Sequence, residues 1–237
     1  MSITAAMVKD LREKTAAGMM DCKKALTECE GDMEKAVDWL RQKGLSKAAK
    51  KAGRATSEGL VGFELAADGK SGVAVEVKCE TDFVARGDKF QDFVKDMVSQ
   101  VAKGEYADSE ALLAAPFVAD ASVTVKEALD GVIATTGENM GLGKFAKLEL
   151  AAGKSGMHSN GKLAVLVEMQ TGNDAAAASE GFHEVVKNVA MQIAAASPLA
   201  VSSEGLDPKV VEHEREVYRQ KAREEGKPEQ IVEKIAE

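Results

Sequence analysis

Residues 73–84 read Val-Ala-Val-Glu-Val-Lys-Cys-Glu-Thr-Asp-Phe-Val. Three valines and a cysteine, from Val73 to Cys79, alternate with other residues, which predicts a β-strand with one buried face. A helical pattern then closes at Gly104, with apolar positions at Phe90, Phe93, Val94, Met97, Val98 and Val101. The four residues Thr81 to Val84 therefore lie where a strand gives way to a helix, and such junctions present side chains on a rigid frame.

Two interpretations of this junction are open. In the structural one, Thr81 or Asp82 caps the helix and Phe83 or Val84 packs against its first turn. In the functional one, the same side chains contact a partner.

An internal repeat helps to choose between them. Three segments recur along the chain: 64–72 as 149–156, 73–77 as 163–167, and 90–95 as 182–187. Each copy predicts strand, turn, strand, junction and helix, so we expect an α+β core of two similar subdomains. The strand at 163–167 in the second copy should bury Leu163, Val165 and Val167, as the strand at 73–77 in the first copy buries its valines.

The two copies differ at the junction. Thr81-Asp82-Phe83 matches Thr171-Gly172-Asn173, so the second copy makes the same transition without Asp-Phe. This difference favours a functional role for Asp82 and Phe83.

The second copy also carries extra residues, 157–162, before its strand. They predict an exposed loop, and exposed loops often carry contacts. His158 is therefore a candidate contact residue, with a solvated loop histidine as the alternative.

The N-terminal residues predict three short helices, the third beginning at Asp32 and ending at Gly44. This small bundle resembles a ubiquitin-associated domain. Met19 and Met20 are adjacent and cannot both face one core, so either one is an adaptable surface contact or both tuck under the preceding turn. The linker at 46–58 is locally basic and could contact phosphate or an acidic protein face. A solvated linker is the favoured interpretation.

Asp207-Pro208 predicts a capped helix start, and Lys227-Pro228 predicts a second one. Together they indicate a projecting helical hairpin whose apolar seam is too narrow to bury itself. The expected organisation is a three-helix domain at 1–45, a linker at 46–58, core subdomains at 59–140 and 141–206, and the hairpin at 207–237.

Composition excludes several function classes. The chain has 237 residues and a formal net charge of −8, which disfavours general binding of nucleic acid or anionic membranes. Its three cysteines show no CxxC spacing, so we expect no disulfide and no metal site. No apolar run could span a membrane and no leader pattern is present, so a cytoplasmic protein is expected.

An enzyme is also disfavoured. Gly-Lys-Ser occurs at Gly69 and Gly153, but the first glycine of a phosphate-binding loop is missing in both cases. His158, His183 and His213 fall in different predicted elements without a partner motif. We expect neither catalysis nor a cofactor.

Three motifs resemble bacterial elongation factor Ts: Thr15-Ala16-Ala17-Gly18-Met19-Met20-Asp21-Cys22-Lys23-Lys24-Ala25-Leu26, Lys47-Ala48-Ala49-Lys50-Lys51-Ala52-Gly53, and Thr81-Asp82-Phe83-Val84. The resemblance covers essentially the whole chain. The family usually has glycine where Ala16 stands. Its members also usually continue beyond the hairpin with a segment that returns to the core, so a shortened or incomplete chain is expected here.

The resemblance implies a guanine-nucleotide exchange factor for elongation factor Tu. The three-helix domain, with Met19 and Met20, would contact the GTPase nucleotide domain, and Thr81 to Val84 would intrude near the bound magnesium and displace it. The second subdomain, including His158, would reach the third domain of the GTPase. The hairpin would serve self-association, giving a homodimer, or packing.

Two other classes remain as alternatives. A non-catalytic adaptor would use the three-helix domain and would not need Asp82 or Phe83. An RNA-binding accessory would need a basic face and stacking aromatic residues, which this acidic, aromatic-poor chain offers poorly.

Overall fold

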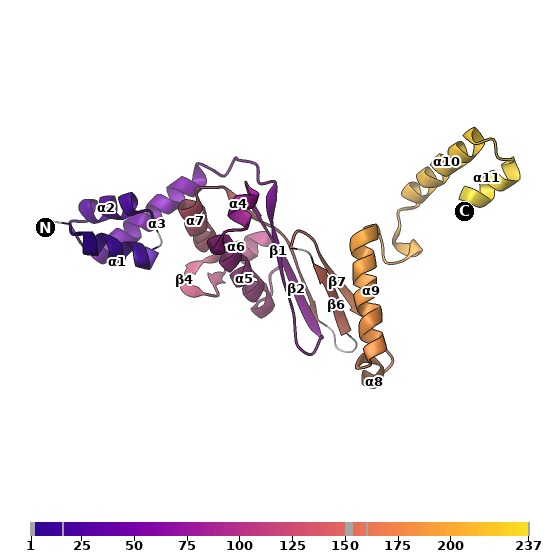
Figure 1. The fold of residues 1–237 in the computed structure, drawn as a ribbon, viewed down its shortest axis with the longest axis horizontal. Helices are drawn as coiled ribbons and strands as arrows, with labels where there is room; N and C mark the ends of the chain where they lie inside the picture. The colour runs from indigo at the N-terminus through magenta and orange to yellow at the C-terminus, as the bar shows by residue number, and fades with distance from the viewer. Residues whose placement is uncertain (1–2, 16, 150–153, 160, 237) are drawn as a thin grey trace. The chain divides into compact units, whose positions relative to one another are not determined.

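The computed structural model describes residues 3–15, 17–149, 154–159 and 161–236, with the backbone alone for 154–159. Helices and small antiparallel sheets combine in it, which confirms the predicted α+β class (Figure 1). The helices are α1 (Ala5–Thr15), α2 (Met19–Glu28), α3 (Met33–Ala49), α4 (Asp82–Ala85), α5 (Asp88–Lys103), α6 (Ser109–Ala114), α7 (Val125–Thr136), α8 (Asp174–Ala177), α9 (Glu180–Ala196), α10 (Pro208–Glu224) and α11 (Glu229–Ala236). The strands are β1 (Glu58–Leu65), β2 (Ser71–Cys79), β3 (Pro116–Phe117), β4 (Asp120–Thr124), β5 (Met140–Glu149), β6 (Lys154–Ser159) and β7 (Ala164–Met169).

The chain divides into two compact units, Met1–Ala194 and Ala195–Glu237. In the first unit, α1, α2 and α3 enclose a small core of Leu11, Cys22, Ala25, Leu26, Ala36 and Leu40. Two side-chain caps are present, because the N–H of Met7 donates to Thr4 Oγ1 at 3.3 Å, and the N–H of Lys35 donates to Asp32 Oδ1 at 3.1 Å at the predicted start of the third helix. The three-helix region predicted at the N-terminus is confirmed.

The predicted end of α3 at Gly44 is wrong. The helix continues to Ala49, and Ala48 packs into the main core. Gly44 is buried beside α7, where an added Cβ would lie 3.5 Å from the Cβ of Ala134, an ordinary contact distance. This glycine lies inside α3 and does not end it, so one continuous helix joins the bundle to the main core.

The main core forms around a three-stranded sheet with the order β1-β2-β5. Val73, Val75, Val77 and Cys79 of β2 are all buried. The six apolar positions predicted for the following helix are buried in α5, which packs on β1 and β2. The strand before the junction and the helix after it therefore fold as their periodicities predict.

The predicted hairpin of the second copy is wrong. Strand β5 pairs with β2 of the first copy, whereas β7 pairs with β6. Residues 157–159, predicted as part of a loop, belong to β6, and His158 lies opposite Val165 in its register. Because β5 pairs with β2, the backbone N–H and C=O groups of β7 need another strand as their hydrogen-bond partner. Strand β6 is that partner.

Burial along β7 also differs from the prediction. Val165 is buried, but Val167 is half-buried and Leu163 is 41% exposed. Leu166, on the opposite face of the strand, lies 3.3 Å from where a Cβ would stand at Gly72 of β2. The first hairpin thus covers the face that the repeat predicted to be outward, and neither face of β7 is buried along its whole length.

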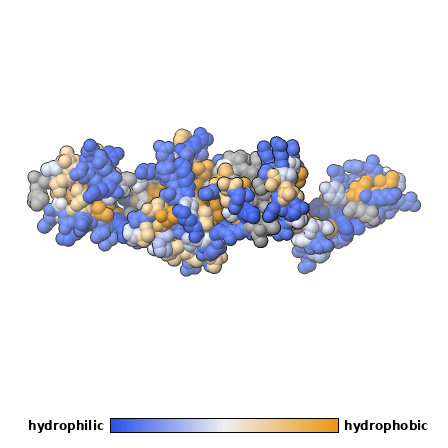
Figure 2. Space-filling model, turned by 90° about the horizontal axis from the view of Figure 1, so that it is seen from below, coloured by the Kyte–Doolittle hydropathy of each residue, from blue (hydrophilic) through white to orange (hydrophobic). Residues whose placement is uncertain are grey.

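The second unit contains the helical hairpin of α10 and α11. Asp207 caps α10 and Pro208 opens it, as predicted. Ala222, Val232 and Ala236 are buried between the helices, while Val217, Tyr218 and Ile231 stay exposed. Hydrophobic colour over the hairpin in Figure 2 is bordered by hydrophilic residues.

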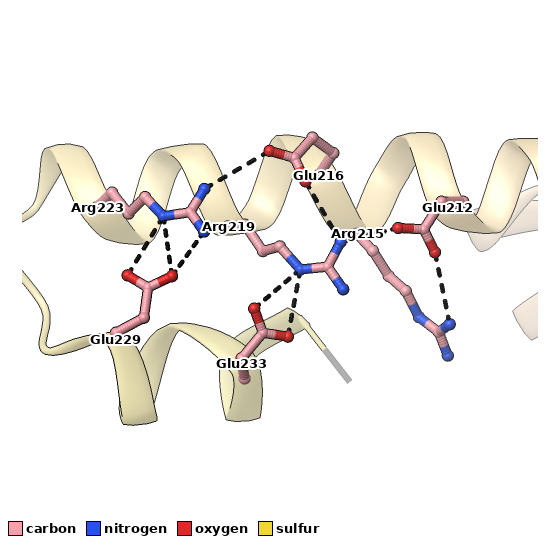
Figure 3. A network of polar contacts seen from close by, with 7 residues as sticks. All are labelled: Glu212, Arg215, Glu216, Arg219, Arg223, Glu229 and Glu233. Atoms are coloured by element: carbon pink, nitrogen blue, oxygen red, sulfur yellow. Dashed lines mark hydrogen bonds and ion pairs between the residues drawn. The ribbon is translucent and has the colours of Figure 1, made fainter.

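Ion pairs supplement this narrow seam (Figure 3). Arg219 contacts Glu212 at 2.8 Å on its own helix and Glu233 of α11 at 3.2 Å. Arg223 contacts Glu229 at 2.6 Å, and this pairing lowers the pKa of Glu229. These exposed pairs hold the two helices in register more than they add stability.

Candidate functional site

The junction between β2 and α5 contains the short helix α4. Thr81 caps it, with its Oγ1 accepting from the N–H of Val84 at 3.4 Å. Ala85 is buried, and Val84 packs against the core. Phe83 faces the other way and is 85% exposed. Thr81 thus fills the predicted capping role and Val84 the packing role, whereas Phe83 packs on nothing within its own helix.

Polar contacts from a distant segment fix this junction. Glu138 accepts hydrogen bonds from the Thr81 N–H at 3.0 Å and from the Thr81 hydroxyl at 2.6 Å. The N–H of Asn139 donates to Glu80 Oε1 at 2.6 Å, which lowers the pKa of Glu80. Neither Glu138 nor Asn139 was predicted as a site residue, because both lie just beyond a helix end more than fifty positions away and carry no local pattern.

Cys79, at the end of β2, adds a third contact to the junction. Its buried thiol donates to the carbonyl of Thr81 at 3.1 Å. Burial, followed by the negative charge of Glu138, raises the pKa of this thiol to about 11. The thiol therefore stays protonated at neutral pH and acts as a hydrogen-bond donor, not as a nucleophile.

The second copy builds the same junction two residues later than the alignment predicted. Asn173 caps α8, with its Oδ1 accepting from the N–H of Ala176 at 2.8 Å, so Asn173 corresponds to Thr81. The correspondence places Asp174 opposite Asp82 and Ala175 opposite Phe83, and it aligns the buried Ala177 with the buried Ala85.

With this correspondence, an aspartate opens the short helix in both copies, which is favourable beside the positive end of a helix dipole. Of the pair Asp82-Phe83, only the phenylalanine is particular to the first copy. Asp82 also pairs with Arg86 on its own helix at 3.0 Å. The local fold therefore accounts for Asp82 in part, and it does not account for Phe83.

Asp82→Ala and Asp174→Ala should accordingly lower stability by similar small amounts, about 0.5 kcal/mol each, because each removes one exposed first-turn charge. Thermal unfolding of the two variants measures the effect. A loss several times larger for Asp82→Ala alone would contradict the equivalence of the two positions.

The bundle presents a second exposed apolar surface. Met19 is 59% exposed and Met20 is 74% exposed, so the alternative in which both tuck under the turn is wrong. They line a groove of about 440 Å³ together with Ile3, Thr4, Ala5, Val8, Lys9, Arg12 and Lys23. Apolar walls with three basic side chains beside them suit a partner surface that combines apolar and acidic residues.

The predicted contact residues do not converge in one pocket. Met19 and Met20 line the groove of the bundle, which contains no residue of the junction. His158 has its backbone in β6, and its side chain lies outside the described part of the chain. His183 lies on α9 and contacts the carbonyl of Ala177 at the end of α8 at 3.1 Å, so its side chain joins these two helices.

The described residues hold no group of three or more histidine, cysteine, aspartate or glutamate side chains that could bind a metal ion. No helix among them has the length and apolar character needed to cross a membrane.

Comparison with known proteins gives a consistent match. The family described as Elongation factor TS matches residues 80–237. The chain is 55% identical to elongation factor Ts of Lawsonia intracellularis, covering 100% of this chain and 82% of that protein. It is 58% identical to elongation factor Ts of Nitratidesulfovibrio vulgaris strain DP4, covering 100% and 79%. It is 49% identical to elongation factor Ts of Clostridium novyi, covering 99% and 76%.

Proposed function

The chain belongs to the elongation factor Ts family of translation elongation factors, and we propose that it promotes release of GDP from elongation factor Tu. In this proposal, Thr81 to Val84 enter the nucleotide site of the GTPase and displace the bound magnesium, which allows GTP to load. The protein performs no covalent chemistry. The observation that carries the proposal is the exposed Phe83 on a helix that is rigidly capped and anchored.

The physical basis is the way GDP is held. Much of the attraction on its phosphates comes from the magnesium ion that bridges them to the protein. A wedge that shifts the groups around the metal removes this attraction without touching the base. Phe83 supplies apolar area for such a wedge, because almost none of its ring is used within this chain.

Asp82 has a smaller part in the proposal. Its carboxylate lies beside Phe83 and can accept hydrogen bonds from groups that order the metal site. The ion pair with Arg86 occupies one of its oxygens, at 3.0 Å. We therefore assign displacement mainly to Phe83.

The remaining parts supply affinity. The bundle would contact the nucleotide domain through the groove lined by Met19 and Met20. The subdomain proposed at 141–206, including His158, would contact the third domain of the GTPase. The hairpin would pair with a second copy of the chain or pack on the complex, and its exposed Val217, Tyr218 and Ile231 support either use.

Release of a fluorescent GDP analogue from elongation factor Tu, with and without this protein, tests the proposal. We expect acceleration that saturates with the concentration of the factor. Binding must also be reciprocal, so added GDP should weaken the complex by the factor by which the protein weakens GDP. Tight binding without acceleration would support the adaptor alternative, in which the bundle alone is active.

A further inference from the structure

We propose that Glu138 is a positioning residue for exchange, acting through Thr81 to hold the helix that carries Phe83. This inference rests on the proposed function. Glu138 follows Gly137, which ends α7 in the left-handed conformation with φ of 84°. That turn brings the carboxylate of Glu138 to the end of β2, 57 positions away in sequence from Thr81.

Each oxygen of Glu138 receives its own hydrogen bond from Thr81. The backbone N–H donates to Oε2 at 3.0 Å, and the hydroxyl donates to Oε1 at 2.6 Å. A hydroxyl has a single proton, so this bond orients the remaining lone pairs of Thr81 Oγ1 toward the N–H of Val84. Glu138 thus fixes both the backbone and the rotamer of the residue that caps α4.

Phe83 depends on this frame because it has little other support. Its ring is exposed, and α4 has only four residues. Val84 and Ala85 anchor one face of the helix in the core, and Thr81 anchors its start. Loss of the start would let the first turn fray, since the first N–H groups of a helix need acceptors outside it.

The second copy supports the assignment. Asn173 caps α8 without any acidic side chain among its described contacts, and Ala175 stands in place of Phe83. In both copies a side chain two residues before the cap donates to the carbonyl of the cap residue: Cys79 at 3.1 Å and Thr171 at 2.9 Å. The contact shared by both copies stabilises the turn before the short helix. The contact with Glu138 is described only for the first copy, which is also the copy with the exposed Phe83.

Glu138→Gln in the full chain tests this role. The variant keeps the size of the side chain but replaces one charged acceptor oxygen with an NH₂ group, so it cannot receive both bonds from Thr81. We expect the maximal rate of GDP release to fall about tenfold, with little change in the concentration of factor giving half the maximal rate, because misplacement of a functional group by about 1 Å can cost up to a hundredfold. Glu105→Gln is the matched control. Glu105 also forms an ion pair with a distant residue, Lys147 of β5, but this pair does not involve the junction.

Two further measurements separate positioning from general stability. Amide hydrogen exchange in the free protein should quicken at residues 84–87 in Glu138→Gln and stay unchanged in α5. Thr81→Val should slow release, and adding Glu138→Gln to it should cause little further loss, because both act on one contact.

The outcomes are distinct. If the unmodified protein does not accelerate release, the proposed function fails, while faster exchange at 84–87 would still show that Glu138 holds α4. If the unmodified protein is active and Glu138→Gln reaches the same maximal rate, the positioning role is overturned. A loss equal to that of Glu105→Gln, or additive with Thr81→Val, would also overturn it.

Discussion

Replacing Phe83 with alanine is expected to slow the maximal rate of catalysed GDP release about thirtyfold or more. An aromatic anchor at the centre of an interface typically contributes roughly 2 kcal/mol or more, and each 1.4 kcal/mol changes a rate or equilibrium about tenfold. Stability should barely change, because the ring is 85% exposed and the same position in the second copy is Ala175. GDP release at saturating factor and thermal unfolding measure the two effects.

Phe63→Ala is the matched control for this variant. Phe63 lies on β1 and is 44% exposed, so its removal uncovers more buried surface than removal of Phe83. We expect the control to be the less stable variant and yet to retain exchange activity. The opposite order, with Phe83→Ala unfolding readily and losing activity in proportion, would make Phe83 a structural residue.

The second large effect is expected from the double variant Met19→Ser, Met20→Ser. Both side chains line the groove of the bundle and are mostly exposed, so the fold should tolerate the change. Loss of two flexible apolar contacts should weaken binding to elongation factor Tu about tenfold to a hundredfold. The maximal rate of GDP release should stay near normal, because Phe83 is untouched.

Calorimetric binding and the concentration dependence of release check this expectation. Phe63→Ser, Leu65→Ser is a suitable control, since it removes two exposed apolar side chains from a different element, β1. Unchanged affinity in the methionine variant would exclude the groove as a contact surface. Together with Phe83→Ala, the pair distinguishes residues that set affinity from residues that set the rate.

The continuous helix α3 affects what removal of the N-terminal bundle would do to the rest of the protein. A flexible linker after Gly44 would make the bundle removable as a unit. Because α3 continues to Ala49 and packs on α7, removal of residues 1–44 would expose the surface of α7 around Ala134. Point substitutions in the groove are therefore a cleaner test of the contact than deletion.

The sequence alone determined the parts of this protein that depend on neighbouring residues. Alternation in β2, the apolar stripe of α5 and the caps at Asp32 and Asp207 were predicted correctly, because local backbone geometry decides which side chains share a face or reach a free N–H. The motif Thr81 to Val84 was also placed correctly at its junction.

Only the tertiary structure decided which segments meet. Periodicity shows that a strand has an apolar face but not which strand pairs with it, so the pairing of β5 with β2 and of β7 with β6 was missed. Gly44 reads as a helix end until Ala134 is seen beside it. Glu138 shows no local signal, because its role comes from a contact across 57 positions that the fold closes when α7 and β2 pack against the same core.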